Sequence, residues 1–172
     1  SFNAMTAGDK VVDTFSYKAL DAVSENDHAD ISTTRVNITV SGANDRPNAV
    51  SETSAVDVVE DGQPVAIDVL ANDTDADEDD TYATLIVNSA TSEKGANVTI
   101  ENGKVVYDPN DVEAFQSLGV GETTTDTVTY TIRDAIGAVS NEATVTMTVT
   151  GTNDIPVASA EKFSAFKGSA FS

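Results

Sequence analysis

The stretch VTYTIRDAIGAVSNEATVTMTV, residues 128–149, decides the fold class of this chain. In VTYTI (128–132) apolar residues alternate with threonine, and VTMTV (145–149) repeats the pattern. Strict alternation gives a strand one buried face and one solvated face. Threonine suits the solvated face because its β-branched side chain favours strands. The stretch therefore predicts two strands of an antiparallel sheet.

The β pattern continues through the rest of the chain. Asn102-Gly103 is a strong turn signal between two short apolar runs. The segment DVEAFQSL (111–118) predicts one helical turn that carries Phe115 and Leu118 inward. Strands spaced about every ten residues with almost no helix are typical of a β-sandwich. The other strands predicted lie at 55–59, 64–70, 84–91, 96–101 and 104–108.

One segment of the sequence occurs twice. FNAMTAGDKVVDTFSYKALDA, from Phe2, aligns with FQSLGVGETTTDTVTYTIRDA, from Phe115, at a spacing of 113 residues. VNITVSGANDRP, from Val36, aligns with VTMTVTGTNDIP, from Val145, at a spacing of 109 residues. A period of about 110 residues fits one immunoglobulin-sized sandwich. We therefore expect a slice of a tandem array: the C-terminal part of one repeat at 1–46, a complete repeat at 47–155, and the start of a third at 156–172.

Charge and composition limit the classes of function. The net charge of −20, from 29 acidic and 9 basic residues, repels phosphate backbones and anionic lipid, so nucleic acid and membrane surfaces are poor partners. The absence of cysteine excludes disulfides, zinc–thiolate sites and thiol catalysis. The sole histidine, His28, lies in a hydrophilic loop, and no nucleophile and base form a recognisable pair. We predict no enzyme activity and no membrane insertion.

The run DVLANDTDADEDD (68–80) concentrates acidic side chains. Six of its last eight positions are carboxylates, and none of the thirteen is Lys or Arg. Like charges about 4 Å apart repel by roughly 1 kcal/mol even in water, so a bound cation would stabilise such a loop. Oxygen ligands in this number suit Ca²⁺, although a solvated acidic loop is the alternative. In an extended loop, alternation would place four carboxylates on one side: Asp73, Asp75, Asp77 and Asp79.

Two longer segments resemble cadherin motifs. ANDTDADEDDTYATL (71–85) is similar to the signature ATDADxGxNAxL, and YTIRDAIGAVSNEATVTMTVTGTNDIP (130–156) resembles the ending AxDxGxPxLSxxxxVxIxVxDxNDNxP. An even closer likeness is to the VCBS and bacterial cadherin-like or Ig-like repeats of large bacterial adhesins, with their DVLANDTDxDGDxL and VTGTNDAPVA phrases. In two places the sequence departs from the pattern: Glu78 replaces the Gly after DxD, and Ile155 replaces the Asn after Asp154.

The resemblance implies an immunoglobulin- or cadherin-like antiparallel β-sandwich in a tandem array, with Ca²⁺ at the junctions between repeats. Asp21 and Asp134 match the family's AxDxG turn, where we expect them to form the turn in preference to binding metal. The implied upstream site comprises Asn44, Asp45, Asp75 and Asp77, with Asp73 and Asp79 as additional ligands. The implied downstream site comprises the base glutamate Glu60 with Asp61, Asn153 and Asp154.

The function that the resemblance implies is a spacer or extender module of an extracellular, secreted or cell-surface bacterial adhesin. Calcium at the linkers would stiffen the array and so support cell adhesion and biofilm formation, and its partners would be neighbouring repeats of the same polypeptide. The alternative is a glycan- or protein-binding sandwich, for which the aromatic content of 6% and the lack of Trp give little support.

The ends of the chain raise a separate question. Residues 8–46 would form a hairpin with an apolar face, and a two-stranded hairpin alone is marginally stable in water. We expect another chain to complete it by strand addition, with its own 157–172 segment as the added strand. The apolar face consists of Phe15, Tyr17, Ile38 and Val40.

Overall fold

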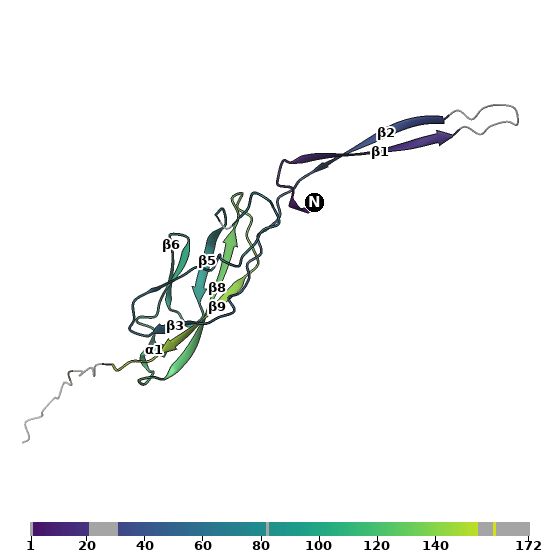
Figure 1. Cartoon of the computed structure of the whole chain (residues 1–172). Helices are drawn as coiled ribbons and strands as arrows, with labels where there is room; N and C mark the ends of the chain where they lie inside the picture. The colour runs from purple at the N-terminus through teal and green to yellow at the C-terminus, as the bar shows by residue number, and fades with distance from the viewer. Residues whose placement is uncertain (1, 21–30, 82, 155–159, 161–172) are drawn as a thin grey trace, which may run out of the picture.

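The computed structural model describes residues 2–20, 31–81, 83–154 and 160. It consists of an elongated β-sandwich from one end of which a two-stranded hairpin projects (Figure 1). Asp21, His28 and the 157–172 segment, apart from residue 160, lie outside the described residues. Among the residues that are described, no helix is long and apolar enough to cross a membrane.

Two sheets form the sandwich, as the alternation of the sequence predicts. The larger sheet has the order β3 (Val56–Val59), β9 (Ala143–Thr150), β8 (Thr123–Arg133) and β5 (Ile86–Ser92). The smaller sheet has the order β4 (Val65–Ile67), β7 (Lys104–Asp108) and β6 (Asn97–Glu101). Neighbouring strands are antiparallel except for β3 and β9, which run parallel.

The core lies between these two sheets. Every second residue of β8 and β9 points inward, and the six predicted core positions there are 0% exposed: Val128, Tyr130, Ile132, Val145, Met147 and Val149. From the opposite side Tyr107 of β7 is equally buried, and Phe115 enters from the short helix α1 (Glu113–Gln116). The predicted helical turn is therefore confirmed, and it closes one end of the core.

Local sequence signals set the strand ends. Asn102 and Gly103 both have positive φ, 51° and 78°, as a two-residue turn of type I′ requires, so the predicted β6–β7 hairpin is confirmed. The strand predicted at 64–70 is shorter than expected, because the chain turns after Ile67. Val69 and Leu70 nevertheless stay buried, since the turn folds back over the core.

One carboxylate lies inside the core. Asp126 of β8 is 1% exposed and accepts hydrogen bonds from Tyr107 Oη (2.8 Å), Ser92 Oγ (2.6 Å) and the Lys94 N–H (3.0 Å). Burial, the hydrogen bond to Asp126 and the charge of Asp126 raise the pKa of Tyr107, so its hydroxyl keeps the proton that it donates. The donors satisfy the buried charge, and this polar contact joins the two sheets.

The hairpin consists of β1 (Lys10–Leu20) and β2 (Ile31–Ser41), preceded by the 3₁₀ turn η1 (Phe2–Ala4). Its antiparallel register runs from the Lys10–Ser41 pair to the Leu20–Ile31 pair. Within the part of the chain that the structure describes, the hairpin forms a sheet of its own. Most of its described side chains are accordingly exposed, with Phe15 at 50% and Tyr17 at 51%, whereas Val36 and Val40 are half-buried.

Candidate metal centre

Three segments meet where the hairpin joins the sandwich (Figure 1): the linker after β2, the acidic loop after β4, and the turn after β8. Side-chain oxygens of Asp75, Asp80 and Asp134 lie within 4.8 Å of one another. Asp134 and Asp80 are 1% and 7% exposed, so this is a buried group of carboxylates rather than a solvated surface.

Asp134 shapes the turn after β8 and also faces the linker. Its Oδ1 accepts hydrogen bonds from the N–H groups of Ile136 (2.9 Å), Gly137 (2.5 Å) and Ala138 (2.8 Å). Its Oδ2 accepts one from Asn44 Nδ2 at 2.8 Å. Burial opposes ionisation, but the bonds from Asn44 and from the backbone outweigh it and lower the pKa of Asp134. The side chain is therefore an anion held in place.

The acidic loop supplies the other side of the group. Asp77 is 3% exposed, and its Oδ2 accepts the Asp45 N–H at 2.9 Å, which ties the linker to the loop. The Asp77 N–H in turn donates to Asp75 Oδ1 at 3.0 Å. Burial raises the pKa of Asp75, the bond from the Asp77 backbone opposes this, and the charges of Asp80 and Asp77 raise it further. Among the described residues, the charges that act on Asp75 are thus those of other carboxylates.

Several oxygens at this place are buried without a donor. Asn44 Oδ1, Asp75 Oδ2 and Asp77 Oδ1 have no hydrogen-bond partner among the described residues. Leaving a buried acceptor unpaired costs about 1–3 kcal/mol, and more for a charged group. A hard cation satisfies such oxygens directly, and Ca²⁺ takes carboxylate and amide oxygens in flexible geometry. The residues present therefore fit a calcium ion. We name them the junction cluster: Asn44, Asp75, Asp77, Asp80 and Asp134.

The other residues predicted for the upstream site lie differently. Asp45 contributes its backbone N–H, and its side chain is exposed. Asp73 is buried but lies outside the group of Asp75, Asp80 and Asp134: its Oδ1 accepts from the Val50 N–H (2.7 Å), and its Oδ2 is buried with no hydrogen-bond partner among the described residues. Asp79 is exposed.

The expectation of an extended loop with four carboxylates on one side is wrong. The loop turns between Asp77 and Asp80, whose N–H donates to the Asp77 carbonyl at 3.2 Å. This turn brings Asp80, rather than Asp79, beside Asp75. The two-residue spacing of the acidic run therefore did not predict Asp80 as a member of this group. For Asp134, the AxDxG likeness was a signal, but it suggested the turn in preference to a ligand.

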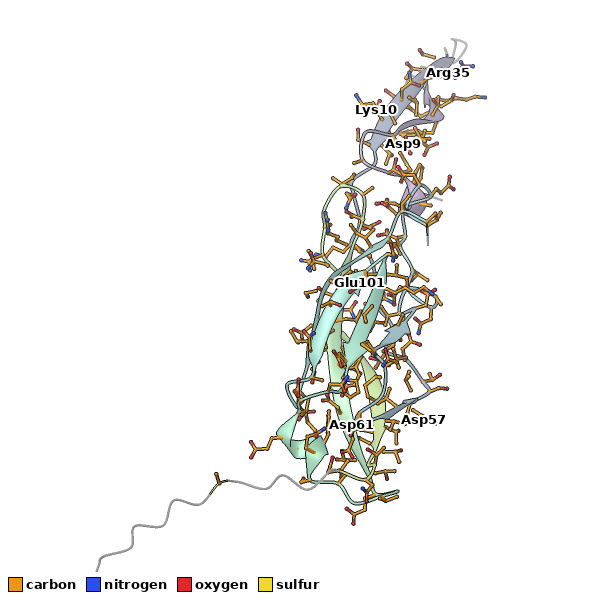
Figure 2. All side chains as sticks on the ribbon, turned by 90° about the vertical axis from the view of Figure 1, so that its left-hand side faces the viewer. Asp9, Lys10, Arg35, Asp57, Asp61 and Glu101 are labelled. Carbon is orange, nitrogen blue, oxygen red and sulfur yellow. The ribbon has the colours of Figure 1, made fainter. Side chains whose placement is uncertain are left out.

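A second acidic group lies at the opposite end of the sandwich. Side-chain oxygens of Glu60, Asp61 and Asp154 lie within 4.8 Å of one another, and we name these three residues the distal cluster. Figure 2 places Asp61 far from Lys10 and Arg35 of the hairpin. Asn153 lies beside the cluster, exposed, with its amide Nδ2 donating to the Asp154 carbonyl at 3.2 Å.

Glu60 is the buried member of the distal cluster. It is 0% exposed, and its Oε1 accepts hydrogen bonds from the N–H of Thr152 (2.5 Å) and from its Oγ1 (3.3 Å). Thr152 Oγ1 also lies 3.1 Å from Asp61 Oδ2. The second oxygen, Glu60 Oε2, is buried with no partner in the described part of the chain. Like the junction cluster, this group offers oxygen acceptors that a hard cation would satisfy.

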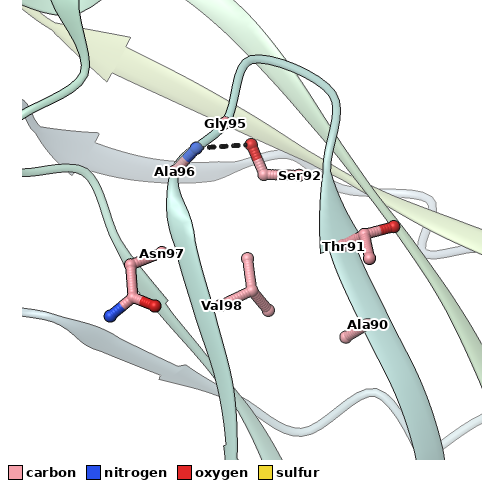
Figure 3. Close-up of a pocket in the computed structure, with 7 residues that line it drawn as sticks. All are labelled: Ala90, Thr91, Ser92, Gly95, Ala96, Asn97 and Val98. Atoms are coloured by element: carbon pink, nitrogen blue, oxygen red, sulfur yellow. Dashed lines mark hydrogen bonds between the residues drawn. The ribbon is translucent and has the colours of Figure 1, made fainter.

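A hollow of about 400 Å³ opens between β5 and β6 (Figure 3). Each of these strands lies at one edge of its own sheet. The lining side chains are small, and none is aromatic or charged: Ala90, Thr91, Ser92, Gly95, Ala96, Asn97 and Val98. The hollow therefore lacks the stacking surfaces on which sugar rings bind.

Comparison with known proteins adds two findings. The family model described as a bacterial cadherin-like domain matches residues 44–151. A crystal structure of mouse protocadherin-24 EC1-3 matches with 19% sequence identity and a TM-score of 0.47, over 81% of this chain and 45% of that one. The chain thus spans less than half the length of this relative. The search of curated proteins gave no match.

Proposed function

The chain belongs to the bacterial cadherin-like domain family, and from this membership we propose that it is a calcium-binding spacer of a secreted or surface adhesin. The fold is the cadherin-like β-sandwich of that family, which is non-catalytic, and such domains are typically extracellular. In this proposal the module supports adhesion mechanically: it holds neighbouring repeats at fixed distances and angles rather than binding the adhesin's target itself.

The junction cluster is the observation that carries the proposal. Asn44 belongs to the linker between hairpin and sandwich, whereas the four aspartates belong to the sandwich. An ion bound to both would neutralise carboxylates that otherwise repel one another and would fix the linker to the sandwich. When bound, Ca²⁺ supplies positive charge and several coordination positions, and the protein supplies buried oxygens already held by the backbone.

The distal cluster extends the proposal along the chain. Glu60 is fixed by Thr152 and Asp61 accepts a hydrogen bond from Gln116 Nε2 at 3.2 Å, whereas the side chains of Asp61 and Asp154 are both exposed to solvent. A neighbouring repeat could add carboxylates of its own to these three. The same module would then hold calcium at both ends, and a row of modules would form a stiff rod.

Calcium titration by calorimetry tests the proposal. We expect the parent chain to bind with a dissociation constant of about 10⁻⁴–10⁻³ M, as is usual for extracellular calcium modules. Asp75→Asn and Asp77→Asn should each weaken binding, because each removes a charge beside an unpartnered oxygen. The matched control is Asp57→Asn, which removes an exposed carboxylate of β3 outside both clusters. Equal titrations for all four chains would contradict a site at the junction.

A further inference from the structure

The hairpin and the β8–β9 pair of the complete repeat are anchored at the base in the same way. The Gly42 N–H donates to the Asp9 carbonyl (2.9 Å), and the Gly151 N–H donates to the Glu122 carbonyl (2.8 Å). The acidic side chains also act alike: Asp9 accepts from the N–H three residues before it at 3.2 Å, and Glu122 does so at 2.8 Å. The two glycines are 109 residues apart in the sequence and the two acidic residues are 113 apart. These are the two repeat spacings of the sequence.

The close approach at these glycines is shared as well. A Cβ on Gly42 would lie 2.2 Å from the Thr6 carbonyl oxygen, and a Cβ on Gly151 would lie 2.5 Å from that of Gly119. Only glycine fits either position without a shift of the backbone. The base of the hairpin therefore repeats the contacts that close the β8–β9 end of the sandwich.

The strand registers match across the two copies. Phe15 pairs with Val36, and Val128 pairs with Val145 at the equivalent place. Cross-strand partners share one face of a sheet. One side of the hairpin, which we name the hairpin face, therefore corresponds to the core side of β8 and β9: Val11, Asp13, Phe15, Tyr17, Val36, Ile38 and Val40.

Exposure separates the two copies. Phe15, Tyr17 and Ile38 are 50%, 51% and 46% exposed, whereas their counterparts Val128, Tyr130 and Met147 are 0% exposed. In the complete repeat those counterparts are covered by the β4–β7–β6 sheet and Phe115. An exposed apolar patch of this kind marks an interaction surface. The hairpin face is thus a core face without its opposing sheet.

Asp13 determines which polar groups a sheet packed on the hairpin face must supply. It lies within the apolar hairpin face opposite Ile38, just as Asp126 lies opposite Met147. Any sheet that covers Asp13 must bring hydrogen-bond donors to it, because an unpaired buried carboxylate is costly. In the complete repeat the Tyr107 hydroxyl of the opposing sheet is such a donor.

We propose that the hairpin face is covered by the equivalents of β4, β6 and β7 of another repeat of this kind, whose strands precede the hairpin along a longer polypeptide, with the equivalent of Tyr107 donating to Asp13. The equivalents of β3 and β5 then pair with the edges of β2 and β1, as β3 and β5 pair with β9 and β8 in the complete repeat. The side chains fit that cover. Three apolar positions of the hairpin face are identical to their counterparts: Tyr17 matches Tyr130, Val36 matches Val145 and Val40 matches Val149. The proposal rests on packing and on one buried hydrogen bond, and it holds with or without calcium.

A completed chain tests this directly. Residues 47–114 are fused ahead of Phe2 of the full chain, because in the complete repeat residue 114 is followed by Phe115, the counterpart of Phe2. Amide hydrogen exchange is compared between parent and fused chain in the presence of a chelator. We expect exchange in β1 and β2 to slow by about 100-fold or more on fusion, because a lone hairpin opens readily and a core pair does not.

The variants isolate the role of Asp13. In the fused chain, Asp13→Ala should reverse most of the gain in protection, since it leaves the tyrosine hydroxyl buried without its acceptor. Ser16→Ala, on the opposite side of β1, should not change it. Equal exchange in parent and fused chains would overturn the proposal. So would a parent that sediments as a dimer with β1 and β2 already protected, because a second copy would then be the occupant.

Discussion

Asp126, Asp134 and Asp79 carry the same side chain in three surroundings. Asp126 is buried in the core and satisfied by hydroxyl and amide donors from the opposing sheet and the β5–β6 turn. Asp134 is buried at the junction, held by three backbone N–H groups and facing other carboxylates. Asp79 is exposed to solvent. The role of each carboxylate therefore follows from its donors and neighbours, and the residues differ in what a substitution would change.

Asp134→Asn should weaken calcium binding by about tenfold or more, a loss of roughly 1.4 kcal/mol. The substitution keeps an oxygen for the three backbone donors of the turn but removes one charge from the junction cluster. Asp79→Asn is the matched control, because it removes an equal charge from the same acidic run at an exposed position. Calcium titration of the two variants measures the difference; equal losses would show general electrostatics rather than a defined site.

Tyr107→Phe should destabilise the sandwich by about 1.5–3 kcal/mol, because it removes a hydrogen bond to a buried charged acceptor. Tyr17→Phe is the matched control: Tyr17 is the exposed counterpart of the core residue Tyr130. Loss of its hydroxyl should change the free energy of unfolding by no more than about 0.5 kcal/mol. Urea unfolding measures both. A Tyr107→Phe variant as stable as Tyr17→Phe would mean that the Tyr107 hydroxyl adds nothing to the core.

At the scale of elements, apolar alternation and turn residues account for most of what the structure shows. The inward positions of β8 and β9 follow from a period of two, and the β6–β7 turn follows from Asn102-Gly103. The parallel pairing of β3 with β9 could not be predicted, because a four-residue strand has no pattern that specifies its partner. The strand predicted at 64–70 is too long because Val69 and Leu70 are apolar and buried although they lie in a turn, and an apolar run in the sequence does not distinguish a buried turn from a strand.

Gly103→Ala should destabilise the β6–β7 hairpin by about 1–2 kcal/mol, because Gly103 has φ of 78° and a Cβ disfavours the left-handed region. Gly103→Asn should cost less, since asparagine tolerates this region better than other side chains. Thermal or urea unfolding of both variants provides the measurement. If alanine and asparagine have the same effect, backbone conformation does not limit this turn.

For the whole molecule, the repeat in the sequence predicts a module with a second partial module joined to it through a short linker. The junction cluster lies at that joint, and the distal cluster lies at the opposite end. The sequence located both acidic groups through family likeness. It named Asn44, Asp75 and Asp77 for the upstream site, but it could not place Asp80 and Asp134 there. The hydrogen bonds that bring these two aspartates to the joint connect segments distant in the chain: the Ala135 N–H with Asp80, and Asn44 with Asp134.

Chelation should leave the sandwich folded while the joint loosens, because the core contains no member of the junction cluster. We expect far-ultraviolet circular dichroism to stay unchanged when calcium is removed. Small-angle scattering should show a broader range of end-to-end distances for the same sample. Without the ion the carboxylates repel one another, and nothing bridges the linker and the sandwich at this place. The Asp134→Asn variant is the control and should show a smaller response. A scattering profile that chelation does not alter would contradict a mechanical role for the ion.

The central claim is that buried oxygens from both sides of the joint share one calcium ion, and electron density from a calcium-soaked crystal tests it most directly. We predict a calcium peak at about 2.3–2.6 Å from side-chain oxygens of both the linker residue Asn44 and the aspartates of the sandwich. Density for water alone among those oxygens would contradict the claim.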